Sequence, residues 1–129
     1  MTVRFLEELT MAKTAHVDTF AGDNLPPREQ WPAFVFSRPE LRYPERLNCV
    51  THFLDRWVEE GRGGEVCLIS GGDTLTYAEL QARVNRICNT LTGRLGLVPG
   101  GRVLLRSANN AMLVATYLAV LKAGGVVVA

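Results

Sequence analysis

The sequence predicts an α/β fold that contains one β-hairpin and one parallel βαβ unit. Two short aliphatic runs, Val103–Leu105 and Val126–Val128, flank a segment of apolar helix formers, which is the order of a βαβ unit. Upstream, two strand-like runs flank Gly71-Gly72-Asp73, a composition that permits positive φ in a tight turn. The composition, 47% hydrophobic and 21% charged, is that of a globular domain.

Two regions are predicted: an extended N-terminal segment over residues 1–47 and an incomplete α/β unit over residues 48–129. Five of the six prolines lie between Gly22 and Asn48, interleaved with aromatic residues. Proline excludes helix, so extended chain is expected there. Two interpretations stay open: the aromatic side chains pack on a surface, or the segment is a partly ordered tail.

The first amphipathic helix is expected over Val50–Glu60, with Asn48 as its cap and Gly61 as its end. A hairpin is expected over Glu65–Tyr77. Thr76 and Glu79 have the spacing of a capping box, which starts a second helix over Tyr77–Leu95 that ends at Gly96. The apolar face expected for this helix consists of Leu80, Val84, Ile87, Leu91 and Leu95.

The remaining chain predicts a strand over Val103–Arg106, a helix over Ala111–Ala123 capped by Asn109-Asn110, and a last strand over Val126–Ala129. The two strands should run parallel with a right-handed crossover. Gly124-Gly125 should end the helix.

Composition and patterning exclude several function classes. The net charge of +1 and the scattered Lys and Arg give no nucleic-acid stripe. Cys49, Cys67 and Cys88 are widely spaced and odd in number, which favours a reduced, cytoplasmic setting. Met1–Thr10 lacks the order of a signal peptide. Lys122 and the two following glycines interrupt the apolar run of residues 111–129, so no membrane span is expected.

No constellation of residues predicts a catalytic or metal site. The glycine groups at 61–64 and 100–101 precede strands and do not join a strand to a helix, so we interpret them as turns. His16 and His52 lack further ligands at metal-site spacing. The adjacent carboxylates Glu7-Glu8 and Glu59-Glu60 are interpreted as solvated. No serine lies in a nucleophile elbow.

Two strings resemble motifs of adenylate-forming enzymes. Leu75-Thr76-Tyr77-Ala78-Glu79-Leu80 is similar to the L-T-Y-x-E-L motif, and the string from Leu121 to Val128 is similar to L-K-A-G-x-x-x-V. Both belong to the N-terminal part of that family. The strings Thr14–Phe20, Leu25-Pro26-Pro27 and Tyr43–Asn48 resemble 2-aminobenzoate-CoA and benzoate-CoA ligases in particular. Ala129 departs from the proline that many general acyl-CoA ligases have at this place.

The resemblance implies a two-step ligation, in which a carboxylate reacts with Mg-ATP to give an acyl-adenylate and the CoA thiol then displaces AMP. The family's phosphate loop ending in Pro-Lys-Gly, its adenine-site aspartate and its C-terminal lysine have no counterpart in this sequence. We therefore assign no catalytic, cofactor-binding or metal residue, and expect no cofactor bound by this chain, although the parent enzyme would use ATP, Mg and CoA. Lys122 is interpreted as compensating the negative end of its helix dipole.

Two functions from different classes follow. In the first, the chain is a fragment of an aromatic acid-CoA ligase whose partner is the remainder of that ligase, and the isolated chain is inactive. In the second, it is a complete small α/β binding or interaction module. Residues 111–129 are apolar on every side, so we also expect a homodimer through them, by paired edge strands or by exchange of the βαβ unit.

Overall fold

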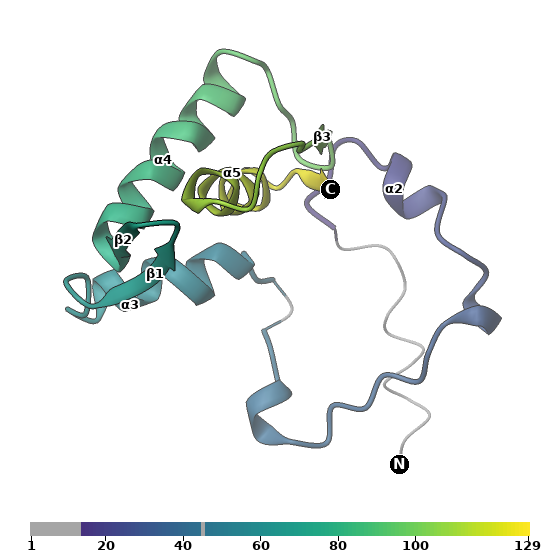
Figure 1. The fold of residues 1–129 in the computed structure, drawn as a ribbon. Coiled ribbons are helices and arrows are strands. Elements are labelled where there is room, and N and C mark those ends of the chain that lie inside the picture. Colours follow the sequence, from purple (N-terminus) through teal and green to yellow (C-terminus); the bar gives the residue numbers. More distant parts are fainter. Residues whose placement is uncertain (1–13, 45) are drawn as a thin grey trace.

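The computed structural model describes residues 14–44 and 46–129. The expectations for Met1–Thr10 and for Glu7-Glu8 lie outside the described residues. Figure 1 shows the described residues in two parts: a packed unit that holds the longer helices and the strands, and an N-terminal segment that arches beside it.

The first helix of the packed unit covers residues 49–59, close to the expected Val50–Glu60. Its first part is a π-helical segment, η3 (Thr51–Asp55), and its second part is α3 (Arg56–Glu59). Hydrogen bonds in a π-helix join residues five apart, so Val50 and Asp55 lie on one side. Both are buried, with exposed fractions of 0% and 7%. The sequence pattern did not predict this π segment.

The expected hairpin is confirmed as β1 (Val66–Ser70) and β2 (Asp73–Thr76), paired antiparallel. Gly71 and Gly72 have φ of 59° and 97°. A two-residue turn of this kind needs positive φ at both positions, which glycine adopts without strain. The register shifts between Val66 and Leu68, which leaves a bulge at Cys67.

Helix α4 (Tyr77–Gly93) starts with the predicted capping box. Thr76 Oγ1 accepts from the Glu79 amide at 3.2 Å, and Glu79 Oε2 accepts from the Thr76 amide at 2.9 Å. The Thr76 hydroxyl also donates to Glu79 Oε2 at 3.0 Å. The hydrogen bonds that the Glu79 carboxylate accepts from the Thr76 amide and, to a lesser extent, from its hydroxyl lower the pKa of Glu79. The assignment of Leu95 to the apolar face is wrong: the helix ends at Gly93, and Leu95 is 72% exposed.

The βαβ unit consists of β3 (Arg102–Leu104), α5 (Ala111–Lys122) and β4 (Val126–Val128). The parallel pairing is confirmed, with Val103 opposite Val127. Asn110 caps α5 by accepting from the Leu113 amide at 2.9 Å. β3 ends before Arg106 because β4 offers only three paired residues, although Leu105 still donates to the Val128 carbonyl. No helix among the described residues is long and apolar enough to cross a membrane.

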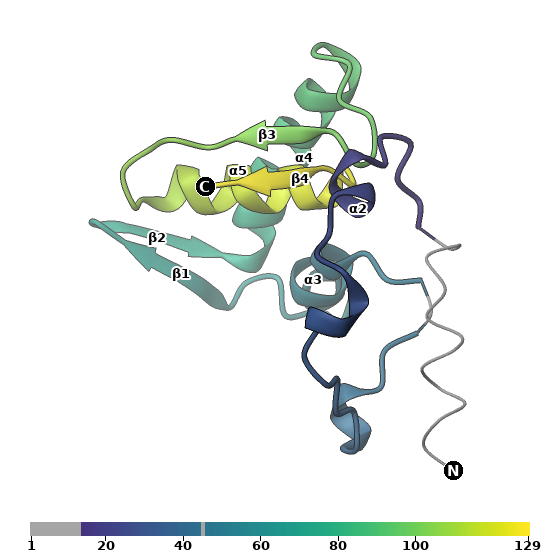
Figure 2. The ribbon, with the colours of Figure 1, turned by 90° about the vertical axis from the view of Figure 1, so that its right-hand side faces the viewer.

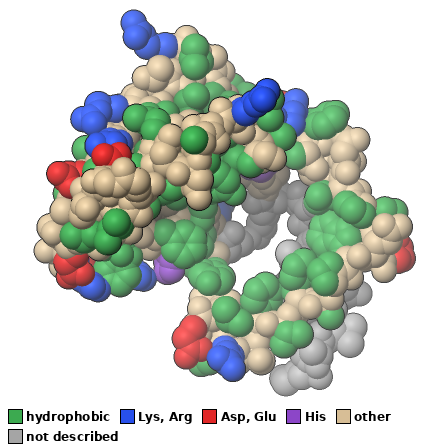
Figure 3. All heavy atoms as spheres, viewed as in Figure 1, with side chains coloured by type: hydrophobic (Ala, Val, Ile, Leu, Met, Phe, Trp, Pro, Cys, Tyr) green, Lys and Arg blue, Asp and Glu red, His purple; other side chains and the backbone are tan. Residues whose placement is uncertain are grey.

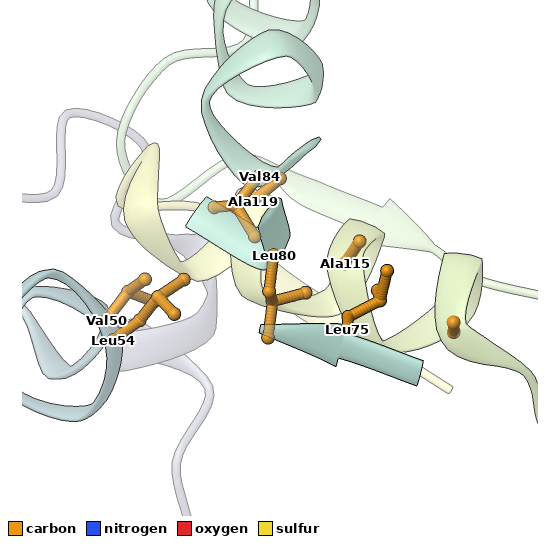
Figure 4. Packing of buried hydrophobic residues seen from close by; sticks show 8 residues of the cluster. Val50, Leu54, Leu75, Leu80, Val84, Ala115 and Ala119 are labelled. Carbon is orange, nitrogen blue, oxygen red and sulfur yellow. The ribbon is translucent and has the colours of Figure 1, made fainter. Parts of the chain in front are cut away.

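The core forms where the 49–59 helix, β2, α4 and α5 meet (Figure 4). Small side chains on α5 let the other elements approach closely, since three of its alanines are essentially inaccessible to solvent. The buried members of the cluster are Val50, Leu54, Leu75, Leu80, Val84, Ala111, Ala115 and Ala119.

Within residues 14–44, the N-terminal segment forms three single-turn elements: α2 (Phe20–Asp23), η1 (Arg28–Gln30) and η2 (Pro39–Leu41). The interpretation that the aromatic side chains of this segment pack on a surface agrees poorly with their exposure. Phe34 stacks on Phe36 at 6.2 Å between ring centroids, and both are about half exposed, at 49% and 51%. Figure 3 shows hydrophobic side chains along this arch.

The ends of the arch contact the packed unit. At its start, the amides of Val17 and Asp18 both donate to the Pro99 carbonyl, at 2.9 and 3.0 Å. At its other end, the Tyr43 ring packs edge-on against His52 at 5.9 Å. The segment is therefore anchored at two points with an exposed stretch between them.

Replacement of Thr76 by alanine should lower the free energy of unfolding by about 1 kcal/mol, because the first turn of α4 loses its side-chain cap. Urea denaturation followed by circular dichroism measures the change. Thr76→Ser should retain most of the stability, and Thr74→Ala, an exposed position on the same strand, serves as a control. Equal losses for Thr76→Ala and Thr74→Ala would contradict the capping role.

Candidate functional site

The two motif strings connect different pairs of elements in the packed unit. Leu75-Thr76-Tyr77-Ala78-Glu79-Leu80 joins β2 to α4, and its Leu75 and Leu80 enter the core. Leu121-Lys122-Ala123-Gly124-Gly125 joins α5 to β4. The second string carries Lys122, which lies at the centre of a cluster of polar side chains.

Lys122 joins three helices through its ammonium group. Its Nζ lies 2.8 Å from Asp55 Oδ1 on the 49–59 helix and 2.7 Å from Asn85 Oδ1 on α4. Gln81, one turn before Asn85, donates from Nε2 to the same Asp55 oxygen at 2.9 Å. The Lys122 and Asp55 side chains are only 21% and 10% exposed, so this is a largely buried ion pair with hydrogen-bonded support.

The environment of Asp55 keeps it ionised. Burial would raise the pKa of this carboxyl, but the hydrogen bonds from Lys122 and Gln81 and the attraction of the Lys122 charge together lower it below its ordinary value of 3.8. The expected role of Lys122, compensation of the helix dipole, is compatible with its place in the last turn of α5. The side-chain contact with Asp55 adds a role that the sequence did not predict.

Asn48 connects the same helices at their ends. Its Oδ1 accepts from the Val50 amide at 3.1 Å, which confirms the predicted cap of the 49–59 helix. Its Nδ2 donates to the Lys122 backbone carbonyl at 3.0 Å. One amide side chain therefore satisfies an N-terminal donor of one helix and a C-terminal acceptor of another.

Gly124 and Gly125 do more than end α5. Gly124 has a φ of 76°, and a Cβ there would lie 3.2 Å from Pro99. A Cβ on Gly125 would lie 3.2 Å from the Gly101 carbonyl oxygen. The Gly100 amide donates to the Gly124 carbonyl, and the Val126 amide donates to the Gly101 carbonyl, both at 2.8 Å. The two glycine turns pack directly on one another.

The histidines and the turn glycine Gly61 take part in local contacts. His52 packs edge-on against Phe53 at 5.4 Å, and His16 lies beside Gly100. Gly61 has a φ of 82° in the turn after α3, as expected of a turn. The three cysteines are unpaired and half-buried. Among residues 14–44 and 46–129, no three His, Cys, Asp or Glu side chains gather as a metal site would require.

The chemistry of the Lys122 cluster is therefore that of a structural junction. The polar side chains of this cluster are hydrogen-bonded to one another. The ammonium group of Lys122 donates to Asp55 and to Asn85. Reasoning from sequence missed Asp55, Gln81 and Asn85. The signal was present: Gln81 and Asn85 are four residues apart on α4, as residues on one helix face are.

Removal of one partner of this ion pair should lower the free energy of unfolding more than removal of one partner of an exposed ion pair does. Lys122→Met leaves Asp55 buried without its counter-charge, so we expect a loss of about 2 kcal/mol in the free energy of unfolding, somewhat below that of a fully buried pair. The double variant Asp55→Leu/Lys122→Met should recover over half of this loss. Glu65→Gln, which breaks the exposed Arg62–Glu65 pair, serves as a control with little expected effect.

The same carboxyl should make stability depend on pH. Because the folded-state pKa of Asp55 is lowered, its contribution is present above the unfolded-state pKa and is lost as the pH falls through the folded-state value. The stability difference between the unchanged protein and Asp55→Asn should therefore be constant near neutrality and shrink as the pH falls below about 4. Urea unfolding of both proteins across this range measures it. A difference that does not vary with pH would contradict the ion pair.

Comparison with known proteins shows which enzymes have a similar sequence and fold. The chain is 36% identical over 91 residues to the benzoate–CoA ligase of Thauera aromatica, a match that covers 70% of this chain and 17% of that ligase. The fold is similar to that of the anthranilate CoA ligase AuaEII in complex with anthranoyl-AMP, with a TM-score of 0.60 and 25% identity over 66% of this chain and 16% of that one. A benzoate CoA ligase from Burkholderia xenovorans LB400 matches with a TM-score of 0.53 and 32% identity over 60% and 15%.

The chain thus spans about one sixth of the length of these relatives. The family described as AMP-binding enzyme matches residues 54–129, which include Asp55, Lys122 and both motif strings. The hairpin and the parallel strand pair are part of the adenylate-forming enzyme fold. Since the match extends over more than half of its residues, this chain belongs to the AMP-binding enzyme family.

Proposed function

We propose that this chain is part of an AMP-forming ligase that joins an aromatic carboxylic acid to CoA. The observation that carries the proposal is the similarity over about two thirds of the chain to an anthranilate CoA ligase with bound anthranoyl-AMP. The identity of 36% to a benzoate–CoA ligase supports the same substrate class. A cytoplasmic location, favoured by three unpaired cysteines, belongs to this proposal.

The proposed reaction has two steps. The acid's carboxylate attacks the α-phosphorus of ATP, a bond to pyrophosphate breaks, and an acyl-adenylate forms. The thiol of CoA then attacks the acyl carbon, AMP leaves, and a thioester results. Both steps need cations and hydrogen-bond donors held where negative charge develops.

In this proposal the described residues support the ligase and do not react. The polar groups of the two motifs are used within the chain, by the capping box and by the Lys122 junction. The residues that hold ATP, magnesium and the aryl acid would then come from the rest of the ligase. The isolated chain would consequently be inactive.

The coding sequence that follows the codon for Ala129 tests the first part of the proposal. An open frame that leads into a Ser/Thr/Gly-rich loop ending in Pro-Lys-Gly is the expected result. The longer protein should then release pyrophosphate from Mg-ATP with benzoate or 2-aminobenzoate, and much less with acetate. A stop codon at that place, or a preference for acetate, would contradict it.

The isolated 129-residue chain should release no pyrophosphate above background with Mg-ATP and either aromatic acid, because the groups that position and stabilise the transferring atoms are missing from its sequence. A coupled pyrophosphate assay on purified protein measures this. A parallel purification of Lys122→Met from the same host controls for a contaminating ligase. Turnover present in the unchanged chain and absent from that variant would overturn the prediction.

A further inference from the structure

Charge is divided unevenly along the chain. All 13 Asp and Glu residues lie between positions 1 and 79. Residues 80–129 carry five arginines and one lysine but no acidic residue: Arg83, Arg86, Arg94, Arg102, Arg106 and Lys122. An asymmetry of this kind points to an interaction surface wherever the basic side chains lack partners inside the chain.

Two of these cations are paired within the chain. The Lys122 ammonium lies 2.8 Å from Asp55 Oδ1, and the Arg102 guanidinium lies 2.8 Å from Asp18 Oδ1. Arg102 also lies over the Phe20 ring, with its Cζ 4.5 Å from the ring centre. The charges of Lys122 and Arg102 are therefore compensated and do not define a surface for another molecule.

The arginines of α4 differ from these two. Arg83 has a carboxylate, that of Glu79, one turn before it. Arg86 and Arg94 are exposed, and none of the ion pairs among the described residues includes either of them. Figure 3 shows Lys or Arg side chains and no Asp or Glu at the upper end of the packed unit, where Figure 1 places the end of α4. This end of the helix is therefore positively charged.

Arg86 and Arg94 lie in one row along α4. Residues four apart are neighbours on a helix face, and the Arg94 amide donates to the Thr90 carbonyl at 3.0 Å, so the row continues to Arg94. The row beside it is apolar and consists of Ile87, Leu91 and Leu95. An open groove of about 330 Å³ follows these rows and is lined by Arg86, Ile87, Thr90, Leu91 and Leu95. No described element covers it, since Thr90, Leu95 and both arginines are exposed.

The two rows identify the kind of partner. The space between two rows of residues four apart is where a ridge of another helix packs. An apolar ridge would contact Leu91 and Leu95, while Asp or Glu beside it would reach the arginines. Arg86 and Arg94 are about 12 Å apart along the helix axis, which is the spacing of carboxylates about two turns apart on a second helix. Charge and shape therefore favour an acidic amphipathic helix.

Other anionic partners fit this surface less well. Nucleic acids are bound through many phosphate contacts, whereas this surface has two uncompensated arginines and an apolar row beside them. An anionic membrane is bound by a wide apolar helix face, but Leu80 and Val84 of α4 are already in the core. A protein helix needs neither condition.

We propose that the C-terminal half of α4 binds an acidic amphipathic helix of another protein. Apolar side chains of the partner lie in the groove over Leu91 and Leu95, and its carboxylates pair with Arg86 and Arg94. This surface belongs to α4, whose neighbours in the chain, β2 and β3, are both described. It does not rest on the ligase function proposed above.

Two labelled helical peptides of about 15 residues test the proposal by fluorescence anisotropy against the 129-residue chain. In the first peptide a row of leucines is flanked by Glu, and in the second Lys replaces every Glu. The Glu peptide should bind at least about tenfold more tightly, because only its charges are opposite to those of the arginines. Added salt should reduce this preference. Leu95→Ser should weaken the Glu peptide, because part of the apolar row is lost.

Charge reversal separates this face from general attraction. Arg86→Glu/Arg94→Glu should reverse the preference, so that the Lys peptide binds more tightly. Arg38→Glu/Arg106→Glu makes the same change of charge at two exposed arginines outside α4 and should keep the preference for the Glu peptide. Far-ultraviolet circular dichroism confirms that each variant is folded.

The proposal would be overturned by a Glu peptide that does not bind up to millimolar concentration, or by equal effects of the two double variants. An oligonucleotide and vesicles of phosphatidylcholine and phosphatidylserine test the other anionic partners. If either displaces the Glu peptide at an equal concentration of negative charge, the surface is a general anion site and the proposal is wrong.

Discussion

The ion pair between Lys122 and Asp55 is the interaction on which the packed unit depends. It joins the 49–59 helix, α4 and α5 through polar contacts, since Gln81 and Asn85 of α4 bond to the same two groups. Such a pair gains little over apolar packing in free energy, because both charges must leave water. It is, however, geometrically demanding. Any other register of these helices would leave a buried charge without its partner.

The π segment and the ion pair belong together. An α-helix with Val50 and Leu54 in the core would turn Asp55 away from Val50, whereas hydrogen bonding five residues apart brings Asp55 to the buried side. π segments are uncommon, and here the wider turn accompanies a carboxylate that reaches two other helices. The 49–59 helix can therefore join the core through apolar and charged contacts at once.

Close backbone approach is the second constraint. The turn at Pro99-Gly100-Gly101 contacts the glycine turn after α5 on one side and the N-terminal segment on the other. Gly100 has a φ of 88°, and a Cβ there would overlap the Asp18 carbonyl. Only glycine satisfies both demands. The turn that leads into β3 is thus also one of the two places where the arch is anchored, together with the Asp18–Arg102 ion pair.

Local chemistry made most elements predictable from sequence. The Thr76–Glu79 capping box fixed the start of α4, Asn110 fixed the start of α5, and Gly71-Gly72 fixed the hairpin, because each is an interaction between residues close in the chain. The family resemblance likewise rested on two continuous strings. Elements whose boundaries depend on distant partners were less accurate: β3 ends where β4 stops pairing, and Leu95 leaves the apolar face because α4 ends first.

The sequence by itself determined the order of helices and strands, the hairpin, the parallel βαβ unit and the family of the chain. Tertiary structure alone decided what Lys122 does, since its partners Asp55 and Asn85 lie 67 and 37 residues away and no local pattern relates them. It also decided that Trp31, Phe34 and Phe36 of the arch pack on one another, whereas Tyr43 packs on His52. The physical reason is the same in both cases: burial and charge pairing depend on which segments meet in space, whereas capping and turns depend on residues a few positions apart.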